Sequence, residues 1–126
     1  MKIYIIDTGS ANLNSVVQAF KRLGYEAVIS SDTDKMEDAD RLVLPGVGTA
    51  CAVMDGIEKF KLYDFILNTK KPLLGICLGM QIQATDSSEV PLNVAGEVIK
   101  CLDIVPSHVV KIPDTGLRLP HMGWNT

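Results

Sequence analysis

The chain has 126 residues, of which 47% are hydrophobic and 21% charged, so it is long enough for one domain with a core and too apolar for a disordered chain. Its net charge of −3 is dispersed and provides no basic surface for nucleic acid or for an anionic membrane. Neither the start, MKIYIIDTG, nor any later stretch has the apolar length of a signal peptide or a membrane span, which predicts a cytoplasmic protein.

Strands and helices are expected to alternate along the first two thirds of the chain. Short apolar runs bounded by turn residues predict strands at 2–6, 25–30, 41–44 and 72–76. Apolar residues at helical spacing predict helices at 13–23, at 50–66 with a break near Gly56, and from 78 to about 84. Because these strands are apolar on both faces, the pattern indicates an α/β fold with a doubly wound, mostly parallel sheet.

The remaining segments carry weaker signals. The polar stretch 31–40 predicts no regular element, and 86–90 is expected to be a loop. Short apolar stretches within 96–110, broken by Pro106, predict strands that pair in antiparallel fashion. No repeat or linker divides the chain, so residues 1–126 are expected to form one domain.

Three turns are expected at one edge of the sheet, where parallel strands place their carboxyl ends and where such folds bind ligands. They are DTGSAN, PGVG and GICLG. In the last of these, Gly75 and Gly79 flank Cys77 between an apolar strand and a helix. This spacing is typical of a nucleophile elbow, in which close backbone contacts require glycine and the central side chain is lifted clear of the sheet.

A thiol at such a turn can act as a nucleophile. Amides at the start of the following helix favour the thiolate of Cys77, and the Leu78 N–H can face a developing oxyanion. PGVG can supply the second donor that an oxyanion needs, although an ordinary Gly/Pro loop is the alternative. A buried cysteine in a tight turn is the alternative for Cys77. Cys51 and Cys101 are expected to be small buried hydrophobic residues, and the odd number and wide spacing of the cysteines indicate neither disulfides nor a zinc site.

Four segments, DTGSANLNSV, LVLPGVGTA, LLGICLGMQ and LPHMGWN, resemble in this order the glutaminase subunits of imidazole glycerol phosphate synthases. These subunits are class I glutamine amidotransferases of histidine biosynthesis, and the resemblance spans residues 1–126. It implies a flavodoxin-like sheet and hydrolysis of L-glutamine to glutamate and ammonia through a cysteine thioester. It also implies a heterodimer in which ammonia passes to a (βα)-barrel cyclase subunit that makes imidazole glycerol phosphate. The glutaminase step in this family needs no metal and no organic cofactor.

The resemblance also implies roles for individual residues. Cys77 is the nucleophile, and the oxyanion is held by the amide of Leu78 and by an amide of the segment Gly46–Val47. Gln81 and Glu89 contact the substrate glutamine, with a solvated loop carboxylate as the alternative for Glu89. Residues near the partner-facing surface are Asn12, His121, Met122 and Trp124. For Trp124, a plain core anchor is the alternative.

The base of the catalytic triad has no counterpart in this chain. In the family a His and a Glu lie two positions apart on a later segment, and no His-x-Glu occurs here. His108 is expected on a strand and His121 belongs to PHMGWN, so neither is assigned as the base. The chain is therefore expected to be the N-terminal part of such a subunit, incomplete at its C-terminus and inactive alone.

Other functions are compatible with the Cys77 turn. One is another class I glutaminase, such as that serving pyridoxal phosphate synthesis, although PHMGWN argues against it. A second is a stand-alone cysteine hydrolase or a redox-sensing thiol protein on the same type of sheet, which would need His121 close to Cys77. A third is a non-catalytic fragment that acts as a binding or regulatory module.

Overall fold

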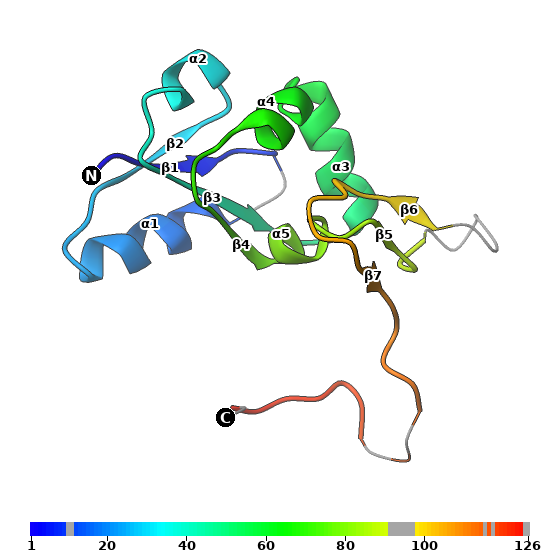
Figure 1. Cartoon of the computed structure of the whole chain (residues 1–126). Helices are drawn as coiled ribbons and strands as arrows, with labels where there is room; N and C mark the ends of the chain where they lie inside the picture. The colour runs from blue at the N-terminus through cyan, green and yellow to red at the C-terminus, as the bar shows by residue number, and fades with distance from the viewer. Residues whose placement is uncertain (10–11, 91–97, 115, 117, 125–126) are drawn as a thin grey trace.

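The structure is a computed structural model that describes residues 1–9, 12–90, 98–114, 116 and 118–124 (Figure 1). Its centre is a parallel sheet of four strands in the order β2-β1-β3-β4. The strands are β1 (Ile3–Ile6), β2 (Ala27–Ser30), β3 (Arg41–Gly46) and β4 (Leu73–Cys77). All four predicted strands are thus confirmed, and the strand order changes direction between β1 and β3, the place where doubly wound sheets bind ligands.

Helices cover both faces of this sheet, as predicted (Figure 1). They are α1 (Leu13–Arg22), α2 (Thr33–Met36), α3 (Ala50–Lys59), α4 (Tyr63–Asn68) and α5 (Leu78–Gln81). Along β3 the side chains alternate, so that Val43 packs toward α1 while Leu42 and Leu44 enter the larger core beneath α3 and α4. This alternation explains why β3 is apolar from Leu42 to Leu44. Among the described residues, no helix is both long and apolar enough to cross a membrane.

One helix prediction is corrected by a contact between residues that are distant in sequence. Helix α3 runs through Gly56 to Lys59, so the predicted break near Gly56 is wrong. A Cβ at Gly56 would lie 1.9 Å from the carbonyl oxygen of Thr8, which means that this glycine serves a close approach between α3 and the turn after β1. The break lies instead between α3 and α4, where Lys61 has a φ of 56°.

A short helix, α2, occupies the polar stretch for which the sequence predicted no element. The Asp32 carboxylate accepts hydrogen bonds from the backbone N–H groups of Asp34 and Lys35, at 3.1 and 3.5 Å. Met36 at the other end is fully buried in the main core. A cap and one buried anchor therefore define a helix too short to show a periodic pattern.

A second, smaller sheet follows α5 and consists of β5 (Asp86–Ser87), β6 (Ile99–Lys100) and β7 (His108–Val109), in the order β6-β5-β7. The predicted antiparallel pairing is confirmed for β6, whereas β7 runs parallel to β5 and the predicted loop at 86–90 includes β5. Of the predicted strand segment 96–110, residues 96 and 97 lie outside the described residues. Backbone N–H groups of Leu102 and Asp103 donate to the carbonyls of Ile82 and Ala84, which fastens this sheet to the turn after α5.

The face of the main sheet that α1 covers is less closed than the opposite face. Its three fully buried residues are Ile3, Ile5 and Val43. Two apolar grooves of about 340 and 320 Å³ share Phe20 and Leu23 among their lining residues. On β4, the outer strand of the sheet, Leu74 is 55% exposed. The strand that carries Cys77 therefore has an open flank.

Candidate active site

Cys77 lies at the carboxyl end of β4, and α5 begins at the next residue. Its backbone has φ 54° and ψ −118°, a conformation that costs an L-residue about 1–3 kcal/mol. The side chain is exposed, so the alternative of a buried cysteine is wrong. The predicted strand-to-helix turn is present, and it presents the thiol to solvent at the edge where the carboxyl ends of the strands meet.

The two glycines around Cys77 are required by close backbone contacts. A Cβ at Gly79 would lie 1.8 Å from the carbonyl oxygen of Leu44 in β3. A Cβ at Gly75 would lie 2.1 Å from Nε2 of Gln83 and 2.6 Å from Cα of Met80. The turn therefore packs α5 directly onto β3 and onto its own strand, as expected for an elbow.

Gln83 is a part of this turn that the sequence did not reveal. Its Nε2 donates a hydrogen bond of 3.1 Å to the carbonyl oxygen of Gly79. The Gln83 side chain thus satisfies a backbone carbonyl of α5, which has only one turn. A glutamine at this position matches no recognised motif, so the contact could be seen only in the structure.

The glycine segment, defined here as residues 46–48, lies beside the Cys77 turn. The parallel register of β3 and β4 places Gly46 opposite Cys77. A Cβ at Gly46 would lie 2.8 Å from the Gly79 nitrogen and 3.2 Å from Leu78, so the two backbone segments touch. Val47 is exposed, and Gly48 has a φ of 92°. The residues predicted to form the oxyanion hole are therefore adjacent, and their role stays a prediction.

Helix α5 is shorter than predicted, since it ends at Gln81 and turns continue to Ala84. One helical turn aligns few peptide dipoles, so the dipole effect of α5 is weaker than that of a long helix. The Leu78 side chain is buried in the main core, which fixes its backbone beside Cys77. Gln81 is half-buried on the same turn, and its contact with substrate stays a prediction.

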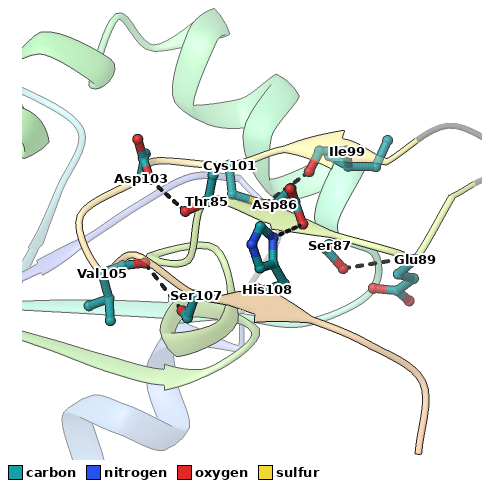
Figure 2. A network of polar contacts seen from close by, with 10 residues as sticks. All are labelled: Thr85, Asp86, Ser87, Glu89, Ile99, Cys101, Asp103, Val105, Ser107 and His108. Atoms are coloured by element: carbon teal, nitrogen blue, oxygen red, sulfur yellow. Dashed lines mark hydrogen bonds and ion pairs between the residues drawn. The ribbon is translucent and has the colours of Figure 1, made fainter.

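Glu89 connects the segment after β5 with the start of α3. Its backbone N–H donates to Ser87 Oγ at 3.2 Å, as Figure 2 shows. Its Oε2 accepts a hydrogen bond of 3.3 Å from the backbone N–H of Ala50, the first residue of α3. The alternative of a merely solvated carboxylate therefore does not describe Glu89, because the group binds a helix end 39 residues earlier in the chain.

The residues predicted to face a partner all occupy exposed positions. Asn12 precedes α1, and His121 and Met122 lie in the tail after β7, which Figure 1 shows leaving the two sheets. Trp124 is fully exposed, so the alternative of a core anchor is wrong for it. Residues 10, 11 and 125 of the matching segments, and also residue 126, lie outside the described residues. Contact of these positions with a partner stays a prediction.

A histidine–aspartate pair lies on the small sheet and was not foreseen. His108 Nδ1 is 2.9 Å from Asp86 Oδ1, across the pairing of β5 with β7 (Figure 2). The predicted strand at His108 is confirmed. The sequence does not predict the contact, because the two residues lie 22 positions apart and no motif links them. The contact ties β7, and with it the start of the tail, to the small sheet.

The other two cysteines differ from Cys77 in their surroundings. Cys101 is buried as predicted, and burial, aided by the charge of Asp86, raises the pKa of its thiol. Cys51 is only half-buried, and its Sγ lies 3.7 Å from the Asp55 carboxylate, whose charge raises the pKa of the thiol. Within the described part of the chain, no group of three His, Cys, Asp or Glu side chains could hold a metal ion.

We expect iodoacetamide at pH 8 to modify Cys77 first, Cys51 more slowly and Cys101 last, as mass spectrometry of digested samples would show. A raised pKa lowers the thiolate fraction at a given pH, and burial also blocks access. Asp55→Asn should accelerate the modification of Cys51 alone, whereas Glu58→Gln on the same helix should leave it unchanged. Modification of Cys101 as fast as that of Cys77 in the folded protein would contradict these environments.

Comparison with known proteins agrees with this arrangement. Residues 4–126 match the family model described as glutamine amidotransferase class-I. The chain is 50% identical over 125 residues to "Imidazole glycerol phosphate synthase subunit HisH" of Photorhabdus laumondii and 48% identical over 125 residues to the subunit of that name in Escherichia coli K12. A HisH 2 subunit of Campylobacter jejuni RM1221 is 53% identical over 125 residues.

These alignments cover 99% of this chain but 62%, 61% and 61% of the three relatives, in the order named, so the chain spans about three fifths of their length. A solved structure described as a glutamine amidotransferase superposes with a TM-score of 0.68 at 19% identity, over 85% of this chain and 55% of that one, which supports the fold. The family match extends over nearly the whole sequence and includes both the Cys77 turn and the glycine segment. The chain therefore belongs to the class-I glutamine amidotransferase family.

Proposed function

We propose that this chain supplies the nucleophile, the oxyanion donors and part of the glutamine pocket of a cytoplasmic glutaminase. Ammonia from this site would pass to a (βα)-barrel cyclase subunit that makes imidazole glycerol phosphate in histidine biosynthesis. The observation that carries the proposal is the exposed thiol of Cys77 on a strained turn, opposite Gly46 in the sheet. The names of the relatives, which are subunits of imidazole glycerol phosphate synthase, support the choice of pathway.

The proposed reaction begins when the Cys77 thiolate attacks the side-chain amide carbon of glutamine. A C–S bond forms, and the carbonyl oxygen becomes an oxyanion held by the amides of Leu78 and the glycine segment. The C–N bond then breaks, and the nitrogen leaves as ammonia after receiving a proton. Water attacks the resulting thioester, the C–S bond breaks, and glutamate leaves while the thiol is restored. Gln81 and Glu89 would hold the substrate during these steps.

The proton acceptor is missing from this set. The sequence contains no His-x-Glu, His108 lies on β7 of the small sheet, and His121 lies in the exposed tail. Since a stand-alone cysteine hydrolase would need a base within this chain, these positions favour the amidotransferase over that alternative. We expect the 126-residue chain to react at Cys77 with an electrophilic analogue of glutamine, but not to hydrolyse glutamine itself.

Labelling with a diazoketone analogue of glutamine tests this proposal. Cys77 should be alkylated selectively, and excess glutamine should slow its labelling without affecting Cys51. The variant Cys77→Ser should take up no label at this position, and iodoacetamide, which lacks the α-amino acid group of glutamine, provides a control reagent. Equal labelling of the three cysteines would contradict a glutamine pocket at Cys77. Glutamate release at the rate of an intact enzyme, measured with the purified cyclase partner present, would contradict the expected inactivity.

A further inference from the structure

The contact between Glu89 and Ala50 links two parts of the candidate site that are far apart in sequence. We infer that Glu89 is a positioning residue, whose hydrogen bond to the Ala50 amide fixes the downstream end of the glycine segment and so places the oxyanion donor beside Cys77. This inference deepens the proposed function and rests on it for the identity of the oxyanion. The bond itself does not depend on any activity.

The first step of the argument is how firmly Glu89 is held. Ser87 is 1% exposed and lies on β5, the central strand of the small sheet. Its hydroxyl oxygen accepts the backbone N–H of Glu89, which fixes the chain direction two residues later. Glu89 lies two residues beyond β5, and this hydrogen bond connects it to the paired strand (Figure 2).

The second step concerns the end of α3. The first amides of a helix have no partner within the helix, and a carboxylate there is favoured by hydrogen bonding and by the helix dipole. Thr49 Oγ1 accepts the N–H of Ala52 at 3.2 Å, and Glu89 accepts that of Ala50. The helix end therefore uses one acceptor from its own N-cap and a second from the segment that follows β5.

The third step is the shortness of the connection. Only Val47, Gly48 and Thr49 separate Gly46 from Ala50, and all three are exposed. The segment is thus fixed at one end by the pairing of Gly46 with Cys77 and at the other end by the buried Ala50. Loss of the Glu89 bond leaves the Ala50 amide without this acceptor, so the second end is held by packing alone and the backbone N–H groups between the two ends are less firmly directed.

Amide hydrogen exchange measured by NMR tests the bond directly. In Glu89→Ala, the Ala50 amide should exchange about tenfold faster, as expected when a charge-assisted hydrogen bond is removed. Glu89→Gln retains an acceptor of the same length and should keep most of the protection. Thr49→Ala is the matched control, because it should accelerate exchange at Ala52 more than at Ala50. An unchanged Ala50 exchange rate in Glu89→Ala would overturn the inference.

The kinetics of labelling separate positioning from substrate binding. With the diazoketone, whose carbonyl takes the place of the glutamine amide, Glu89→Ala should lower the maximal labelling rate of Cys77 about tenfold. Glu89→Gln should retain most of that rate and weaken the apparent affinity. The iodoacetamide rate at Cys77, which needs no oxyanion donor, should not change in either variant. Weakened affinity with an unchanged maximal rate in both variants would show a substrate-binding residue only and would overturn the inference.

The two proposals can fail separately. If the wild-type chain shows no selective labelling while Ala50 exchange still responds to Glu89→Ala, the proposed function is overturned and the hold of Glu89 on the glycine segment is supported. Both Glu89 variants should unfold within about 1 kcal/mol of the wild type in urea, because the side chain is exposed. Loss of labelling through unfolding would therefore be recognised in the same samples.

Discussion

Gly79→Ala should destabilise the chain by about 3 kcal/mol or more, measured as the free energy of unfolding in urea. The new methyl carbon would lie 1.8 Å from the carbonyl oxygen of Leu44 and 3.0 Å from the carbonyl carbon of Pro45. Because both atoms belong to the backbone of β3, no side-chain rotation can relieve the overlap. Either α5 must leave the sheet or the Cys77 turn must open, and each change exposes the buried side chain of Leu78.

The neighbouring residue provides the control for this prediction. Met80 is 59% exposed on the same helix, so Met80→Ala should change the free energy of unfolding by about 0.5 kcal/mol or less. In ordinary helices Gly→Ala stabilises, which makes the sign of the effect at position 79 informative. A Gly79→Ala variant as stable as the wild type would mean that α5 does not pack against β3 as described.

Cys77→Gly should abolish labelling by the diazoketone completely and yet make the chain about 1 kcal/mol more stable than Cys77→Ala. Both variants lack the thiol, so they differ only in backbone preference. Glycine relieves the strain of φ 54° and ψ −118°, which outweighs its larger entropy in the unfolded chain. Urea unfolding of the two variants gives the difference directly.

The same pair of substitutions at Cys51 should give the opposite order. Cys51 lies inside α3, where alanine is favoured over glycine by about 1 kcal/mol. Cys51→Gly should therefore be less stable than Cys51→Ala. If Cys77→Gly were also less stable than Cys77→Ala, the backbone at position 77 would not be strained, and this prediction would be wrong.

The sequence predicted those parts of the fold that depend on local patterns. Apolar runs identified the four strands of the main sheet, and helical spacing identified α1. The turn at Cys77 was identified by the glycines that flank it between a strand and a helix. The family followed from the order of four motifs, and the comparisons confirm it. These features can be predicted because each is specified by residues that are neighbours in the chain.

The missed features depend on contacts between distant residues or on very short elements. Gly56 was interpreted as a helix break because the sequence gives no sign that Thr8 passes beside it. The strand β5 has two residues and no period to detect. The bond between His108 and Asp86 and the bond between the Ala50 amide and Glu89 each join separate segments of the chain. Surface carboxylates are common, so the sequence does not show which partner each one binds.

The open flank of β4 has a consequence for how the nucleophile is supported. In the described sheet, β4 pairs with β3 on one side, and Cys77 is its last residue. Within the described residues, the position of the sulfur therefore depends on the register between β3 and β4 and on the packing of α5 against β3.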